Sequence, residues 1–290
     1  MNEKLVDRLF ELIRSASTDL PADVEGALRR AKDREPEGST PANTFGAILD
    51  NVRMARENGT PICQDTGSLV FYVHHPVGTD TIRFREAIEK AAERATKEIL
   101  LRPNAVDPVT GKNTGTNIGV NAPYVSFKPW RKDEIEVRLM LKGGGSENVG
   151  TQYKLPDGGL GAGRDLEGVR KCVLDAIFKA QGMGCAPGIA GVGIGGDRAT
   201  SFLLSKEQFF RELGSRNPDP ELDALEKRLH RELNELGIGP MGFGGKTTVL
   251  GAFVGKQHRH PATFYVAVSY MCWACRRKAM TLCNGEVRHD

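Results

Sequence analysis

Glycine gathers in four clusters along this chain, and these clusters restrict the possible folds more than any other feature. They read KGGGSENVG, PDGGLGAG, GIAGVGIGG and GPMGFGG, in a chain that has 34 glycines among 290 residues. Because glycine has no Cβ, such clusters predict tight turns or places where the backbone approaches another group closely. Simple surface loops would explain one such cluster easily and four less easily.

Helical and strand-like patterns alternate around these clusters. Helical patterns cover 3–15, 42–57, 80–100, 165–181, 197–211 and 219–236. Strand patterns cover 69–73, 134–141, 247–254 and 263–271. Asp80 is the candidate N-cap of the third helix, and Gly237 is the stop signal of the last. With no repeat and no low-complexity linker, we expect a mixed α/β fold: a single domain over residues 1–290, with helices around small mixed β-sheets.

The charge balance argues against several classes of partner. The chain carries 40 basic and 37 acidic residues, a net charge of +3. This balance predicts binding to neither nucleic acid nor a membrane surface. No apolar run approaches the roughly 20 residues that a membrane helix needs. The N-terminal MNEKLVDRLFELIRS lacks a signal-peptide core, so we expect a cytoplasmic protein.

Three local motifs resemble well-known sites but fit them poorly. GVGIGG has the GxGxxG spacing, yet GCAPGIA precedes it where a strand is required, and Glu212 lies beyond a helix instead of at a strand end. GPMGFGGKTT has Pro240 where a phosphate loop needs glycine. CWAC, residues 272–275, follows a strand near the C-terminus, unlike a redox pair or a zinc site.

The six cysteines differ in their surroundings. In a reducing cytosol we do not expect disulfides. Cys172 lies within a predicted helix, where a buried apolar role is the simplest interpretation. Cys63, Cys185 and Cys272 each adjoin a strand or a glycine-rich turn, from which a thiolate can project into a cleft. Cys283, near the C-terminus, suggests no role.

The segment PICQDTG contains polar and reactive side chains that apolar packing does not require. An amide, a carboxylate and a hydroxyl follow Cys63 directly, in Gln64, Asp65 and Thr66. The polar segment 101–123 is long for a structureless loop, which favours a functional role for it.

Seven blocks of the chain resemble the class I iron–sulfur hydro-lyases, that is, the α subunit of the fumarate hydratase and L-tartrate dehydratase family. The likeness runs in order from about residue 40 to the C-terminus, so it is far more specific than any single motif. The blocks are PICQDTGSLVFYV, LRPNAVDPVTGKNTGTNIGVNAPYV, KGGGSEN, GCAPGIAGVGIGGDRATS, GSRNPDPEL, LGIGPMGFGGKTTVLG and HRHPATFYVAVSYMCWACRR.

The resemblance implies an oxygen-sensitive [4Fe-4S] cluster bound at three loop cysteines, Cys63, Cys185 and Cys272. Four thiolates would leave an electron carrier, whereas three leave one iron open as a Lewis acid for a 2-hydroxy diacid. Cys275 stands where the family often has Ala or His, so we interpret it as an extra thiol. Ala186 stands where a second proline is common.

The resemblance also implies roles at the substrate. Gln64 contacts substrate, and Asp65 transfers a proton or orients the group that does; an Asx turn that only shapes the loop is the alternative for Asp65. Arg102 clamps a carboxylate, unless it is a solvated surface residue. His260 hydrogen-bonds substrate, unless it is structural. Gly145 offers its backbone amide.

Single-chain members of this family continue into a domain with a further lysine and arginines. We therefore expect a β subunit in trans that carries Lys and Arg site residues, in an α2β2 assembly. The expected reaction is the hydration of fumarate to (S)-malate. The alternatives are L-tartrate dehydratase and a non-catalytic iron–sulfur protein that binds or senses; a zinc-binding scaffold is a third.

Overall fold

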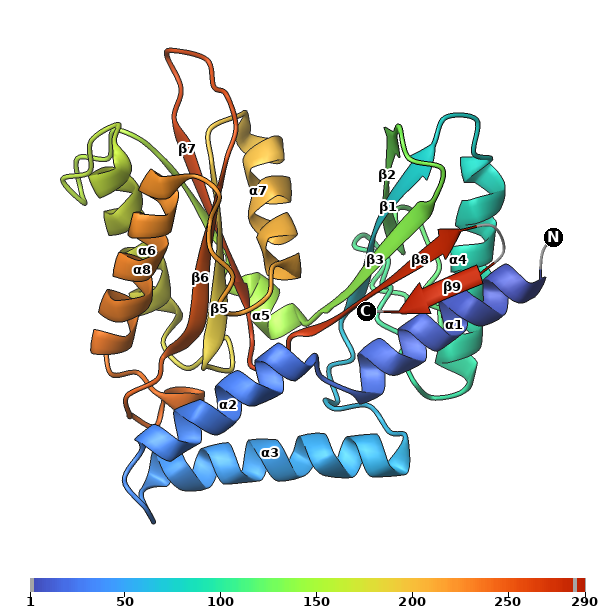
Figure 1. The fold of residues 1–290 in the computed structure, drawn as a ribbon, viewed down its shortest axis with the longest axis horizontal. Coiled ribbons are helices and arrows are strands. Elements are labelled where there is room, and N and C mark those ends of the chain that lie inside the picture. The colour runs from blue at the N-terminus through green and yellow to red at the C-terminus, as the bar shows by residue number, and fades with distance from the viewer. Residues whose placement is uncertain (1–2, 284–285, 290) are drawn as a thin grey trace. The chain divides into compact units, whose positions relative to one another are not determined.

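The structure, a computed structural model, describes residues 3–283 and 286–289. The chain forms two compact units, and Figure 1 follows it by colour. Unit 1 comprises Met1–Pro21, Asn51–Gly144 and Ala274–Asp290, as far as these are described, and unit 2 comprises Ala22–Asp50 and Gly145–Trp273. The chain therefore passes between the units four times, and neither unit is a continuous segment.

Each unit combines helices with one small mixed sheet, which confirms the predicted mixed α/β class. That residues 1–290 act as one hydro-lyase α-subunit domain stays a prediction.

The sheet of unit 1 has five strands in the order β2-β1-β3-β8-β9. β1 pairs in parallel with β2, and the other neighbours pair antiparallel. The strands are β1 (Ser68–Pro76), β2 (Tyr124–Trp130), β3 (Ile135–Lys142), β8 (Arg276–Cys283) and β9 (Glu286–His289). β1 contains the predicted strand 69–73, and β3 contains most of the predicted strand 134–141.

Two amphipathic helices complete the core of unit 1. They are α1 (Glu3–Thr18) and α4 (Thr81–Lys97), which pack against each other, and they confirm the predicted helices 3–15 and 80–100. Asp80 caps α4 as expected, because its Oδ1 accepts a hydrogen bond from Arg83 N at 3.0 Å. The inner face of α4 is largely alanine, which allows close approach of α1.

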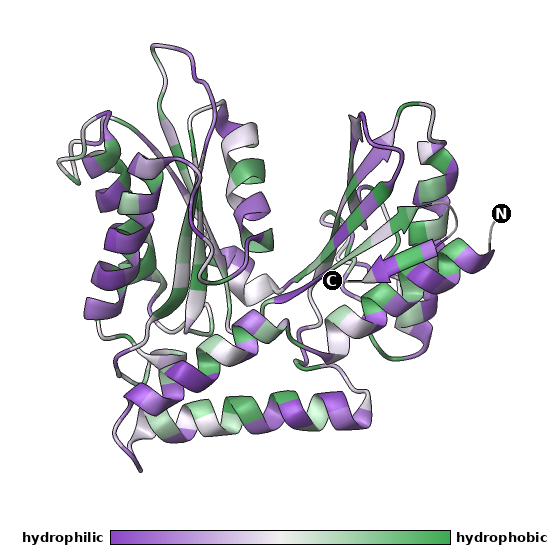
Figure 2. Ribbon diagram, viewed as in Figure 1, coloured by the Kyte–Doolittle hydropathy of each residue, from purple (hydrophilic) through white to green (hydrophobic). Residues whose placement is uncertain are grey.

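The sheet of unit 2 has four strands in the order β4-β7-β5-β6, with β5 and β6 parallel. The strands are β4 (Thr151–Lys154), β5 (Gly188–Ile194), β6 (Val249–Lys256) and β7 (Tyr265–Met271). β6 and β7 confirm the predicted strands 247–254 and 263–271. Figure 2 shows β5, β6 and β7 mostly green to white, in keeping with the helices that pack on them.

Three helices cover this sheet. α6 (Leu166–Ala180) and α8 (Pro220–Glu235) lie on one face, and α7 (Arg198–Glu207) lies on the other (Figure 1). They confirm the predicted helices 165–181, 197–211 and 219–236. The segment 197–211 ends in a 3-10 helix, η1 (Gln208–Phe210), which directly follows α7. α8 stops as expected near Gly237, which has φ +66°.

The glycines of GIAGVGIGG allow α7 to lie directly on β5. A Cβ on Gly193 would overlap the carbonyl oxygen of Ser201, and one on Gly191 would overlap that of Ser205. The sequence analysis missed β5 because glycine is depleted in strands. β5 begins before GVGIGG and includes its first four residues, where no strand was expected, and α7 follows as predicted. The dinucleotide interpretation still fails, because Glu212 follows η1 and not a strand.

One more predicted helix is confirmed, and several elements were not predicted. α3 (Thr40–Asn58) confirms the predicted helix 42–57, and the boundary between the units falls within it. The sequence analysis did not predict α2 (Ala22–Arg34), the short α5 (Gly144–Asn148), the 3-10 helix η2 (Pro240–Gly242), or strands β2, β4, β8 and β9.

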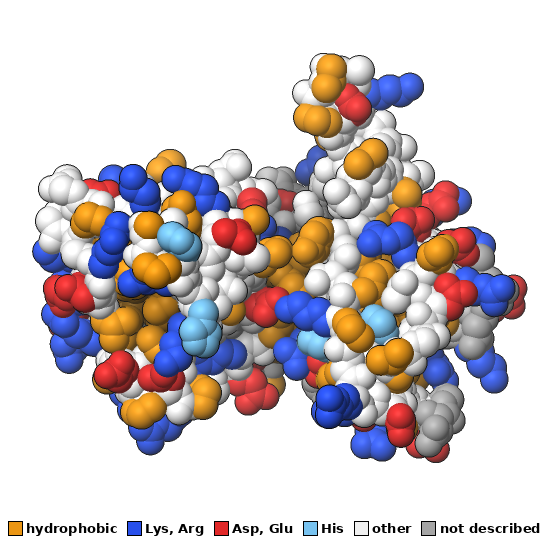
Figure 3. Space-filling view, turned by 90° about the horizontal axis from the view of Figure 1, so that it is seen from above, with side chains coloured by type: hydrophobic (Ala, Val, Ile, Leu, Met, Phe, Trp, Pro, Cys, Tyr) orange, Lys and Arg blue, Asp and Glu red, His pale blue; other side chains and the backbone are white. Residues whose placement is uncertain are grey.

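Figure 3 shows basic and acidic side chains interspersed over the face in view, in keeping with the net charge of +3. In residues 3–283 and 286–289, no helix combines the length and the apolar composition that crossing a membrane requires. The cytoplasmic location stays a prediction.

Candidate functional site

The loop 61–67, which links α3 to β1, is held firmly in unit 1. At its start, Ile62 N donates to the carbonyl of Ser17 at 3.0 Å. At its end, Gly67 has φ +82°, and a Cβ there would lie 2.8 Å from the backbone of Leu141. Only glycine fits this conformation and this close approach to β3. The loop therefore presents its polar residues from a rigid support.

Asp65 connects this loop to the start of α5. Its Oδ1 accepts from Gly67 N at 3.0 Å, which is the Asx turn considered as the alternative role. Its Oδ2 accepts from Gly144 N at 2.7 Å. Both oxygens are thus oriented by backbone donors. A part in proton transfer stays a prediction. Gly145 is the next residue in α5 and is exposed.

Gln64 and Arg102 lie beside each other at the surface of unit 1. Thr66 Oγ1 accepts from Arg102 N at 2.9 Å and from Asn104 Nδ2 at 3.2 Å, which holds the start of segment 101–123 against the loop. Arg102 Nη1 points to the carbonyl of Gln64 at 3.5 Å. Both side chains are exposed. Unit 1 thus brings together Gln64, Asp65 and Arg102.

Arg276 is a residue that the sequence analysis missed. It is 1% exposed, and among the described residues its Nε and Nη1 atoms have no hydrogen-bond partner. A Cβ on Gly143 would lie 3.1 Å from Asp65 Oδ2 and 3.7 Å from Arg276 Nη2, so all three residues border one small space. A buried cation without a partner is costly. This arrangement fits an anionic group bound beside Arg276.

Cys185 and Cys272 lie close together in unit 2. Cys185 occupies the turn between α6 and β5 with φ +57°, and Cys272 directly follows β7. Trp273 N donates to the carbonyl of Cys185 at 3.3 Å, which joins the two loops. Both cysteines are half-buried.

Tyr270 lies beside both of these thiols. Burial raises the pKa of Tyr270, and negative charge on Cys272 and Cys185 raises it further. Its hydroxyl has no hydrogen-bond partner in the described part of the chain. A Cβ on Gly184 would lie 2.6 Å from the ring, so glycine is needed for this packing. The two cysteines therefore lie next to a buried aromatic ring.

The third predicted ligand, Cys63, belongs to unit 1 and is also half-buried. Within residues 3–283 and 286–289, no three or more His, Cys, Asp or Glu side chains are grouped closely enough to hold a metal ion. The residues present nevertheless fit an iron–sulfur group. Accessible thiols are its usual ligands, and within unit 1 Arg276 supplies a buried positive charge whose Nε and Nη1 atoms have no hydrogen-bond partner among the described residues.

His260 lies in unit 2, in the loop between β6 and β7. Its Nδ1 accepts from Ala262 N at 3.1 Å, so the proton of the neutral ring is on Nε2. Arg259 Nη1 donates to the carbonyls of His260, Pro261 and Thr263 at 3.0–3.1 Å, which fixes the loop. His260 is exposed and lines a cavity of about 750 Å³.

The other three cysteines, which form no disulfide among the described residues, differ from these in their surroundings. Cys172 is fully buried in the core on α6, as predicted, and burial raises the pKa of its thiol to about 12. Cys275, the extra thiol, is buried and accepts from Arg277 Nη1 at 3.6 Å. Cys283 is half-buried at the end of β8.

Comparison with known proteins agrees with these features. A model of the family described as "Fumarate hydratase (Fumerase)" matches residues 6–281. A protein of Geobacillus stearothermophilus named "Putative fumarate hydratase class I" is 52% identical over 278 residues, which are 95% of this chain and 54% of the relative. The L(+)-tartrate dehydratase subunit alpha of Escherichia coli K12 is 35% identical over 287 residues, 95% of this chain and 91% of the relative. The chain thus spans about half the length of the first relative and most of the second.

Proposed function

This chain belongs to the fumarate hydratase family, and from that premise we propose that it is the cluster-binding α subunit of a hydro-lyase that interconverts fumarate and (S)-malate. The observation that carries the proposal is the joining of the Cys185 and Cys272 loops through Trp273 N, beside the buried Tyr270. A pair of accessible thiols on adjoining turns suits a metal group better than it suits packing.

We propose that Cys63, Cys185 and Cys272 hold a [4Fe-4S] cluster. When bound, such a cluster supplies an open iron that acts as a Lewis acid toward a hydroxyl and a carboxylate oxygen. Arg276 places a fixed positive charge beside Asp65. This charge would stabilise the negative charge of cluster or substrate without rearrangement of the protein.

The exposed side chains of Gln64 and Arg102 bind substrate in this proposal. A guanidinium can hold a carboxylate through two parallel hydrogen bonds. Asp65, with both oxygens oriented by backbone donors, transfers a proton or orients the group that does. His260 donates its Nε2 proton to a substrate oxygen, and Gly145 offers its amide.

A β subunit completes the site in this proposal, with further Lys and Arg residues, in an α2β2 assembly in the cytoplasm. One finding supports a partner. The E. coli relative is named a subunit alpha. The same E. coli name favours L-tartrate dehydration as the second candidate function.

The test is an anaerobic reconstitution of the chain with and without its β subunit, followed by iron and sulfide analysis. Activity is then measured with fumarate, malate and both tartrate enantiomers. We expect Cys63→Ser, Cys185→Ser and Cys272→Ser each to lose iron, and Cys283→Ser to keep it. Iron retention in all three variants at the level of Cys283→Ser would refute the proposed ligands.

Spectroscopy distinguishes the enzyme from an iron–sulfur protein that only binds or senses. If one iron is open, we expect the electron paramagnetic resonance spectrum of the reduced, paramagnetic cluster to change when malate or fumarate is added. A cluster whose spectrum ignores both acids would favour the non-catalytic alternative, and zinc in place of iron and sulfide would favour the scaffold.

A further inference from the structure

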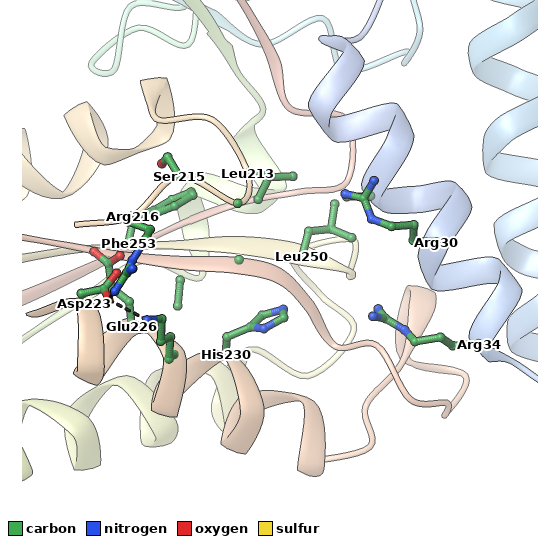
Figure 4. Close-up of a pocket in the computed structure, with 15 residues that line it drawn as sticks. Arg30, Arg34, Leu213, Ser215, Arg216, Asp223, Glu226, His230, Leu250 and Phe253 are labelled. Atoms are coloured by element: carbon green, nitrogen blue, oxygen red, sulfur yellow. Dashed lines mark hydrogen bonds and ion pairs between the residues drawn. The ribbon is translucent and has the colours of Figure 1, made fainter. Parts of the chain in front are cut away.

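Unit 2 contains a second cavity, of about 290 Å³, that includes none of the predicted site residues. It is bordered by α2, α8 and β6, and by the turn that precedes α8. Figure 4 shows its lining side chains. Two arginines of α2, a histidine of α8 and an apolar floor from β6 meet there. The cavity is near the lower end of the size range of small-molecule sites.

Arg30 and Arg34 bring positive charge to this cavity from one face of α2. They are four residues apart, so their side chains lie on neighbouring turns of the same face. Arg34 Nη2 donates to Thr247 Oγ1 at 3.1 Å. In the described part of the chain, neither arginine has a carboxylate partner, and both are exposed. Figure 4 shows the guanidinium of Arg34 directed toward His230.

The carboxylates of the cavity are already neutralised by other cations. Asp223 accepts from Arg216 at 2.8 Å and from Lys227 at 2.7 Å. Glu226 forms two hydrogen bonds with Arg211, at 2.5 and 3.0 Å. The positive charge of the two α2 arginines is therefore not balanced by either acid. An anion of two negative charges would balance it.

The pKa of His230 responds to the positive charge of Arg34. The His230 side chain is half-buried, and burial, followed by the nearby charge of Arg34, lowers its pKa. An anion between Arg34 and His230 would oppose the effect of Arg34, because it would favour the protonated ring. His230 can thus serve as a reporter for the cavity.

The floor of the cavity is apolar. Leu250, Ala252 and Phe253 of β6 form it together with Leu213. A ligand with only charged groups would leave this surface unused. The lining therefore suits a ligand that has oxygens at one end and a carbon skeleton at the other.

We propose that this cavity binds a small organic dianion, with its carboxylate or phosphate oxygens on Arg30 and Arg34 and its carbon skeleton on β6. The proposal goes beyond the hydro-lyase function and does not depend on it, because all lining residues belong to unit 2 and none is a predicted cluster ligand.

The test follows the His230 ring by NMR in the full chain while one probe is added. Inorganic phosphate and succinate are used in separate arms. We expect a saturable shift of the His230 resonances and a rise in its pKa with at least one probe. The arm that responds at lower concentration identifies the phosphate or carboxylate source.

Variants locate the binding. The double variant Arg30→Gln, Arg34→Gln is expected to weaken binding about tenfold or more, because it removes the charge-assisted hydrogen bonds. Arg29→Gln is the matched control: it lies on the same helix and pairs with Glu25, outside the cavity. The arginines in the double variant are exposed, so folding should be preserved, and circular dichroism checks this.

Two outcomes would overturn the proposal. One is the absence of any saturable His230 shift in the unmodified chain with either probe at 10 mM, roughly the weak limit of a specific small-molecule site. The other is a double variant that binds as tightly as Arg29→Gln. The NMR readout is local to His230 and needs no turnover. A negative result for dianion binding would therefore not bear on the hydro-lyase proposal, and loss of the hydro-lyase proposal would not bear on dianion binding.

Discussion

Replacing Arg276 with methionine should change the stability of the cluster-free and the cluster-loaded protein in opposite directions. In the cluster-free chain the substitution removes a buried cation whose Nε and Nη1 atoms have no hydrogen-bond partner among the described residues. Methionine keeps most of the apolar packing of the side chain. In the loaded chain the same change removes a positive charge beside Asp65, where we propose that the site carries negative charge.

The structure gives the size of the first effect. Each buried donor without a partner costs about 1–3 kcal/mol, so the two atoms together cost roughly 2–6 kcal/mol. Since 1 kcal/mol shifts the melting temperature of a chain this long by about 2–4 °C, the cluster-free variant should melt at least about 4 °C higher. In the loaded protein, loss of one charge-assisted contact worth about 1.5–3 kcal/mol should weaken cluster retention by roughly tenfold or more.

Thermal unfolding under anaerobic conditions measures the first effect, and iron release to a chelator measures the second. Arg131→Met, at an exposed position of unit 1, is the control and should behave as the unmodified chain does. A cluster-free Arg276→Met variant that melts no higher than the control would show that Arg276 is adequately paired within the protein. Unchanged iron release would show that it does not face the cluster or its ligands.

Three further changes test the structure. Gly193→Ala should destabilise unit 2 by about 1–3 kcal/mol in urea unfolding, because the new Cβ would overlap the Ser201 carbonyl oxygen. Gly158→Ala is the control and should be neutral, because open space surrounds Gly158. Equal urea midpoints for the two variants would contradict the packing of α7 on β5. Hydrogen bonds from Arg216 and Lys227 hold the pKa of Asp223 well below its usual range, so its contribution is complete above the unfolded value near 4 and is lost as pH falls further. Asp223→Asn should therefore lower the urea midpoint at pH 7, and the difference should shrink at pH 3; a constant difference would argue against this ion pair. Cys172 should resist alkylation by iodoacetamide at pH 8, because burial raises its pKa to about 12; mass spectrometry that finds it labelled in the native protein would contradict its burial.

Local patterns predicted most of the amphipathic helices, although not α2. α4 and α8 combine long apolar periodicity with Asp80 and Asp219 as N-caps, and both formed close to the expected bounds. β5 was missed because its glycines serve close packing with α7, and strand propensity does not report such contacts. Patterns in a single sequence are reliable where the residue types are selected by the formation of one helix. They fail where the residue types are selected by a contact with another element, as in β5.

The contacts in the candidate site are likewise of two kinds: some could be predicted from the sequence, and others depend on tertiary pairing. Gln64 and Asp65 adjoin Cys63 in sequence, so their proximity was predictable. The contact of Asp65 with Gly144 N joins residues 79 positions apart. Arg276 reaches this region only because β8 pairs with β3, which places it opposite Leu141. No periodicity in CWACRR indicates that pairing, and arginines are rarely buried, so nothing in the sequence singled out Arg276.

The four passages of the chain between the units bear on the order in which the protein can fold during synthesis. β8 lies between β3 and β9, inside the sheet of unit 1, yet the ribosome makes it only after the whole of unit 2. All strands of unit 2 are synthesised before β8, so unit 2 can fold first. Until β8 is made, the edge of β3 that pairs with it stays unpaired. The segment 272–276 is therefore made late in synthesis. It contains Cys272 and Arg276, and it leads into β8 and β9, which complete the sheet of unit 1.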